Sequence, residues 1–187
     1  MAEALLRHHL HAAGLPLPVS SAGTLGWNSA GPTDHTLTAL AERGVPLEGH
    51  ISRRMNRDLI AAAALVITMT NDHADAVANH CADATSRTFV LGQLVRLGER
   101  CGPRGDLSIS QWVEEVDALR DTRRRRALPH DEIRDPLGEP LPAYQALAVE
   151  LEDLTARLTR LLAAAGRADK VDSQAGRQEP AAVSQDG

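Results

Sequence analysis

The sequence predicts an α/β domain whose short parallel β-sheet is covered by helices on both faces. Residues 65–69 (Leu-Val-Ile-Thr-Met) and 87–91 (Arg-Thr-Phe-Val-Leu) are rich in β-branched or aromatic residues, and the first run is apolar on both sides, as buried parallel strands are. Segments with helical spacing of apolar residues separate and follow these strands, and such alternation is typical of parallel sheets. With 187 residues, of which 43% are hydrophobic, the chain has the size of one globular domain.

The other elements follow from periodicity and from the residues that end them. Leu5, Leu6 and Leu10 line one side of the first helix, which Gly14 ends, and residues 18–22 are predicted to be a short strand before a glycine-rich loop. Asp34, Asn56 and Asn71 are the predicted N-caps of three helices. The helices are expected at residues 2–13, from 34 to a stop at 44, and at residues 57–63, 71–81, 93–98, 109–126 and 144–164.

We expect residues 1–166 to form this domain and residues 167–187 to be a disordered tail. The tail has no large apolar residue except Val171 and Val183 and is rich in Gln, Asp, Ala and Gly.

Composition and charge exclude several classes of function. A formal net charge of -5 gives no overall basic footprint for nucleic acid or an anionic membrane. The longest apolar run, residues 59–67, is too short to span a bilayer, and no signal-peptide pattern opens the chain. Cys81 and Cys101 are too few for a disulfide framework or a cysteine-rich zinc site. We expect a soluble cytoplasmic protein without a cofactor or a metal.

Three short motifs occur in a characteristic order. Met1-Ala2-Glu3-Ala4 opens a helix, Ser21-Ala22-Gly23-Thr24 closes a predicted strand, and Asp135-Pro136 precedes the last helix. Further matching positions are Trp27, Pro32, Asp34, Gly44, His50 and Met69. Together these residues resemble the low-molecular-weight protein tyrosine phosphatase family over about residues 1–165.

The resemblance implies a flavodoxin-like, three-layer α/β/α fold in which strand one lies between strands two and three. In the family, Met-Ala-Glu directly follows a Cys-x5-Arg-Ser-Pro loop that carries the nucleophile. This chain begins where that loop would already have ended. We therefore expect the first, central strand and the nucleophile loop to be absent from these 187 residues, so that the domain is N-terminally truncated.

The resemblance also assigns roles to several residues. Asp135 matches the general acid, which protonates the leaving group and then activates water, two steps that one carboxyl can perform in turn. Trp27 matches a residue that walls the substrate entrance, and Leu137 stands where an aromatic residue often lines the cleft. Ser21 and His50 match polar residues that brace the nucleophile loop.

Other candidate sites have simpler explanations. Cys81 and Arg87 have the formal Cys-x5-Arg spacing, but a helix precedes Cys81 and the intervening residues lack glycine and include an aspartate. Cys101, with Arg104 nearby, has no strand before it, so both cysteines are expected to be unreactive. The histidines His8 and His11 and the basic run at residues 123–126 are interpreted as solvated helix surface.

Three functions are compatible with these observations. The first is hydrolysis of a phosphorylated protein or a small aryl phosphate, with the nucleophile loop encoded upstream of the assigned start. The second is a non-catalytic pseudophosphatase that binds phosphorylated partners. The third is arsenate reduction, for which the spacing of Cys81 and Cys101 is unsuitable, so we rank it last. The oligomeric state does not follow from the sequence.

Overall fold

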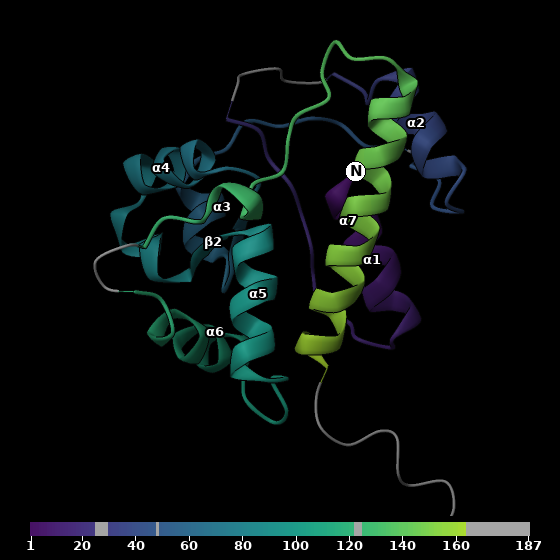
Figure 1. Cartoon of the computed structure of the whole chain (residues 1–187). Coiled ribbons are helices and arrows are strands. Elements are labelled where there is room, and N and C mark those ends of the chain that lie inside the picture. Colours follow the sequence, from purple (N-terminus) through teal and green to yellow (C-terminus); the bar gives the residue numbers. More distant parts are fainter. Residues whose placement is uncertain (25–29, 48, 122–124, 164–187) are drawn as a thin grey trace, which may run out of the picture.

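The computed structural model of the chain describes residues 1–24, 30–47, 49–121 and 125–163. Its sheet consists of two parallel strands, β1 (Val66–Thr68) and β2 (Thr88–Val90), with Ile67 opposite Phe89. Helices surround this pair (Figure 1). They are α1 (Ala2–Ala12), α2 (Asp34–Ala41), α3 (Arg57–Ala62), α4 (Asn71–His80), α5 (Leu91–Cys101), α6 (Ile109–Ala118) and α7 (Leu141–Leu162), with short 3-10 turns η1 (Ala82–Arg87) and η2 (Pro129–Asp131). The predicted α/β class with a short parallel sheet is confirmed.

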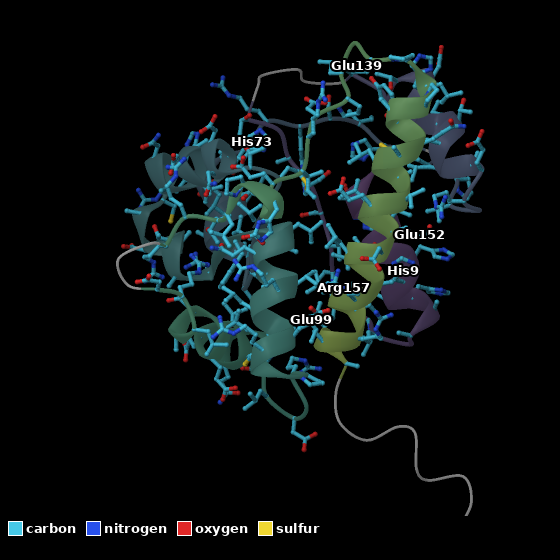
Figure 2. The ribbon with its side chains drawn as sticks, viewed as in Figure 1. His9, His73, Glu99, Glu139, Glu152 and Arg157 are labelled. Atoms are coloured by element: carbon cyan, nitrogen blue, oxygen red, sulfur yellow. The ribbon has the colours of Figure 1, made fainter. Side chains whose placement is uncertain are left out.

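The long helix α7 packs against the first helix of the chain. It packs against α1, α2 and α5, and Figure 1 shows it as the yellow-green helix beside purple α1. Arg157 of α7 forms hydrogen bonds of 2.8 Å to both carboxylate oxygens of Glu99 on α5, and the Thr155 hydroxyl lies 3.0 Å from His9 Nδ1 on α1 (Figure 2). Helix α5 also contacts both strands, so α7 is positioned relative to the sheet through α5.

The main core lies around β2 and α5. Phe89 and Trp112 are fully buried, and the N–H of the Trp112 indole donates to the Gly102 carbonyl at 2.9 Å. Gly98 allows α5 to approach its neighbours closely, because a Cβ there would lie 2.9 Å from Leu161 and 3.0 Å from Trp112. A side chain at this position would therefore force α5 away from α6 and α7.

The predicted strand at residues 18–22 does not form. These residues are outside any strand, and the nearby pairing is a single parallel bridge between Gly23 and Arg54. The Val19 carbonyl instead accepts from the Arg7 guanidinium at 2.9 Å, and the Ser21 carbonyl accepts from Arg53 at 2.8 Å. Because a strand needs a partner backbone for its ladder, side-chain donors leave this segment as an isolated extended connection.

Two predicted caps are wrong by one residue. Thr33 caps α2 by accepting from Thr36 N at 3.2 Å, so Asp34 is the first helical residue. Thr70 likewise caps α4 by accepting from His73 N at 3.2 Å. Threonine and its neighbouring Asp or Asn are all good cap residues, and backbone geometry selects the one in the extended conformation. The predicted Asn56 cap is confirmed, since its side chain accepts from Leu59 N at 2.9 Å.

Helix α6 ends earlier than residue 126. It stops at Ala118, and Arg120 then turns inward, with its guanidinium carbon 3.5 Å from the centre of the Phe89 ring. Burial lowers the pKa of Arg120 to about 10, against the opposing effect of Asp117. The tail predicted at residues 167–187 lies outside the described residues. Among the helices described, none is long and apolar enough to cross a membrane.

Candidate functional site

The segment that carries Asp135 is attached to the carboxyl end of β1. Ile133 N donates to the Met69 carbonyl at 2.8 Å, just after the strand. The Glu132 carboxylate accepts from both the backbone and the side-chain nitrogen of Asn71 at 2.7 Å. Since ligands of open α/β sheets bind beyond the carboxyl ends of strands, these bonds place the segment at the expected position for a site.

A buried ion pair fixes the same segment from the other side. Asp131 is 2% exposed and accepts from Arg96 of α5 at 3.0 and 2.7 Å and from Leu128 N at 2.8 Å. Burial raises the pKa of Asp131, but the hydrogen bonds from Arg96 and Leu128 outweigh it, so the net pKa lies below its ordinary value. A Cβ on Gly92 would lie 2.5 Å from the Asp131 carbonyl oxygen, so η2 and α5 are in close backbone contact.

Asp135 itself is exposed. Its carboxylate accepts from Leu137 N at 3.0 Å through Oδ1, as in an Asx turn. Leu137 is 71% exposed, and Gly138, with φ at 85°, turns the chain toward α7. The arrangement presents an accessible carboxyl on an anchored turn, which is suitable for proton transfer to or from a bound molecule.

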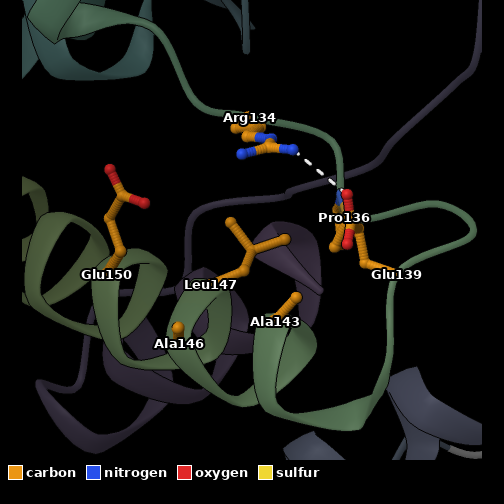
Figure 3. Close-up of a pocket in the computed structure, with 7 residues that line it drawn as sticks. All are labelled: Arg134, Pro136, Glu139, Ala143, Ala146, Leu147 and Glu150. Atoms are coloured by element: carbon orange, nitrogen blue, oxygen red, sulfur yellow. Dashed lines mark hydrogen bonds and ion pairs between the residues drawn. The ribbon is translucent and has the colours of Figure 1, made fainter.

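A pocket opens beside this turn (Figure 3). Its volume is about 280 Å³, and it lies between the Asp135 turn and the first half of α7. An ion pair of 3.1 Å between Arg134 and Glu139 spans the turn. The lining residues are Arg134, Pro136, Glu139, Ala143, Ala146, Leu147 and Glu150.

Ser21 and His50 meet at a third residue, Glu3. The Ser21 hydroxyl donates to the Glu3 carboxylate, and His50 Nδ1 lies 3.7 Å from the same oxygen. Arg7 approaches the other Glu3 oxygen at 2.8 Å. Glu3 belongs to the motif Met1-Ala2-Glu3-Ala4, but the sequence assigned it no role beyond that of an acid in the first turn of a helix. No hydrogen bond or ion pair within the described chain joins this cluster to Asp135, and Trp27 lies outside the described residues.

Neither cysteine is placed as a nucleophile. Cys81 is 7% exposed and packs with Ile60, Val77 and Ala84, and the Arg87 guanidinium donates to backbone carbonyls. Burial raises the pKa of the Cys101 thiol, and the Glu115 carboxylate 3.8 Å away raises it further. Burial leaves little access to the Cys81 thiol, and the raised pKa of Cys101 disfavours its reactive thiolate form.

The remaining polar candidates are structural. In the part of the chain that the structure describes, no group of three or more His, Cys, Asp or Glu side chains could hold a metal ion. In the basic run, residues 123 and 124 fall outside that part. Arg125 pairs with Asp117, and Arg126 pairs with Asp75 at 2.6 Å, so both form surface ion pairs. They do not lie at a helix end as predicted, because α6 ends at Ala118.

The chain is similar to known phosphatases. Residues 1–101 match the family model for low molecular weight phosphotyrosine protein phosphatase. A protein-arginine-phosphatase of Bacillus subtilis is 26% identical over 162 residues, which are 87% of each chain. That of Geobacillus stearothermophilus is 28% identical over 163 residues, 87% of this chain and 86% of the relative.

Solved structures extend the likeness to the fold. A mutant of YwlE from Bacillus subtilis superimposes with a TM-score of 0.63 and 25% identity, over 84% of this chain and 85% of that one. A low molecular weight protein tyrosine phosphatase from T. tengcongensis has a TM-score of 0.65 over 86% and 88% of the two chains; at 19% identity it supports the fold alone. The resemblance predicted from the motifs is confirmed, and the chain belongs to the low molecular weight phosphotyrosine protein phosphatase family.

Proposed function

We propose that residues 1–166 form the domain of a phosphatase that acts on phosphorylated side chains of proteins, with Asp135 as its general acid and base. The observation that carries this proposal is the exposed Asp135 carboxyl on a turn fixed to β1 and α5. A general acid must reach the leaving atom while its own position stays defined. Solvent exposure meets the first requirement, and the bonds of Ile133 and Asp131 meet the second.

In this mechanism Asp135 donates its proton to the leaving atom of the substrate as the bond to phosphorus breaks. The same carboxylate then takes a proton from the water that releases phosphate from the enzyme. Leu137, exposed beside Asp135, contacts the substrate's leaving side chain, and Ser21 and His50 brace the phosphate-binding loop through Glu3. Neither Cys81, which is buried, nor Cys101, whose thiol pKa is raised, is placed to supply the thiolate nucleophile of this mechanism.

The substrate we favour is a phosphorylated arginine side chain. The curated relatives are called protein-arginine-phosphatases, and Leu137 replaces the aromatic residue expected beside phosphotyrosine. A guanidine is a much stronger base than a phenolate, because the pKa of a guanidinium lies well above the value of about 10 for tyrosine. Proton donation by Asp135 is therefore more important for phosphoarginine than for phosphotyrosine.

A second candidate is a binding module without catalysis. The buried Cys81 and the high-pKa thiol of Cys101 favour it, because these are the two cysteines of the chain. In this form the domain binds a phosphorylated partner with the same turn and pocket, but it does not catalyse hydrolysis.

Phosphatase assays on two polypeptides separate these candidates. The polypeptide of residues 1–187 is expected to have no thiol-dependent turnover of phosphoarginine or aryl phosphate, because loss of a nucleophile lowers rates by several orders of magnitude. The product of the natural reading frame, including any upstream in-frame codons, is expected to be active if those codons encode Cys-x5-Arg. Turnover by residues 1–187 that alkylation of Cys81 or Cys101 abolishes would overturn the first expectation. Inactivity of a longer product that contains the loop would favour the binding module.

A further inference from the structure

The pocket beside Asp135 has an apolar floor and a charged rim. Ala143, Ala146 and Leu147 on α7 form the floor (Figure 3). At about 280 Å³ the pocket is just below the roughly 300–1,000 Å³ typical of small-molecule sites, so it suits one long side chain better than a complete ligand.

Among the described residues, none pairs with the Glu150 carboxylate at one end of the pocket. Figure 3 shows Glu150 and Leu147 on α7, with Arg134 on the segment above them. Arg134 is already paired with Glu139 at 3.1 Å, whereas Glu150 has no hydrogen bond or ion pair to any side chain in the described ranges. Its neighbours one helical turn away are Ala146, Leu147, Asp153 and Leu154, none of which is a cation.

An apolar channel that ends at an unpaired carboxylate matches one kind of side chain. Lysine and arginine have a hydrocarbon stem that packs on apolar surface and a cationic end that seeks an anion. A purely apolar side chain would cover Glu150 without pairing it, and an anionic one would be repelled. The net charge of -5 adds a general attraction for basic partners.

The position of the pocket connects it to the candidate reaction. Arg134 and Pro136, on either side of Asp135 in the sequence, both line it. We propose that this pocket binds an unmodified lysine or arginine side chain of the protein substrate, close to the phosphorylated residue. This inference rests on the proposed function only where it calls the bound protein a substrate. Binding of a basic side chain can be measured without turnover.

The test is a titration of the full chain with short peptides, followed by NMR of the backbone amides of residues 141–150. The probes are glycine-serine peptides that contain one arginine, one norleucine or one glutamate. We expect shift changes in these amides with the arginine peptide alone, and weaker binding at 0.5 M salt than at 0.02 M. Glu150→Gln should weaken binding about two- to fivefold, the range for an exposed ion pair.

Two further variants complete the design. Ala146→Lys places a cation one turn before Glu150 and should abolish the shift changes by occupying the pocket from within. Glu114→Gln on α6 removes an equally exposed carboxylate elsewhere and should bind as the natural chain does. Equal responses of the Glu150 and Glu114 variants, or binding of the norleucine peptide, would overturn the proposal. If selective binding persists but a longer product that contains the Cys-x5-Arg loop is inactive in every phosphatase assay, the proposed function fails and the pocket assignment stands.

Discussion

The buried pair of Asp131 and Arg96 provides the sharpest test of how the candidate site is held. Asp131→Asn keeps the size of the side chain but removes its charge and replaces one acceptor oxygen by a donor. Three hydrogen bonds converge on this carboxylate, two from Arg96 and one from Leu128 N. The amide can accept on one side only, so one of the donors that face it loses its partner.

The expected loss of stability follows from these contacts. A hydrogen bond to a charged group contributes about 1.5–3 kcal/mol, and a neutral one about 0.5–1.5 kcal/mol. The Arg96 side chain is 35% exposed, so water can solvate part of its charge when the ion pair is lost. The lower half of the range for charged hydrogen bonds therefore applies. We expect the free energy of unfolding to fall by about 2 kcal/mol, which lowers the melting temperature by about 4–8 °C for a domain of this size.

The pH dependence gives an independent readout. Because the folded-state pKa of Asp131 is lowered, its contribution is complete above the unfolded pKa of about 3.9 and is lost as pH falls through the lower folded value. Urea denaturation should therefore show a constant difference between the natural chain and Asp131→Asn from pH 7 to about 5, and a shrinking difference toward pH 3. Hydrogen exchange in residues 132–138 should become faster in the variant.

Asp106→Asn is the matched control, since Asp106 is exposed. It should leave the melting temperature within about 1 °C, as surface changes usually do. A difference between the Asp131 variant and the natural chain that stays constant down to pH 3 would refute the assigned charge interaction. Unchanged hydrogen exchange in residues 132–138 would refute the claim that this pair holds the turn.

Two other substitutions test the same region. Gly92→Ala would place its Cβ 2.5 Å from the Asp131 carbonyl oxygen, so the two backbones must separate, and we expect the free energy of unfolding in urea to fall by about 1–3 kcal/mol. Gly102→Ala is the comparison, because Gly102 has open space around it but φ at 98°, so this variant tests backbone strain alone. A Gly92→Ala variant as stable as the natural chain would contradict the close contact. In a catalytically active form of the protein, Asp135→Asn should slow hydrolysis of substrates with strongly basic leaving groups far more than that of activated aryl phosphates. An equal loss across a leaving-group series would remove Asp135 from the role of general acid.

Much of this protein could be predicted from local sequence. The strands around Ile67 and Phe89 and the helix with Leu5 and Leu10 follow from residue type and periodicity, which depend on near neighbours. The motif Asp135-Pro136 can also be read from the sequence, because it is a contiguous pair of residues before the last helix.

Tertiary structure decided the rest. Residues 18–22 have strand-like composition, but a strand exists only where another backbone completes its ladder, and here Arg7 and Arg53 take the carbonyls instead. The meeting of Ser21 and His50 at Glu3 joins three separate parts of the chain, and the pairing of Asp131 with Arg96 joins two. Such contacts depend on how α1 and α5 pack against the segments beside them, and no local pattern in the sequence records that packing.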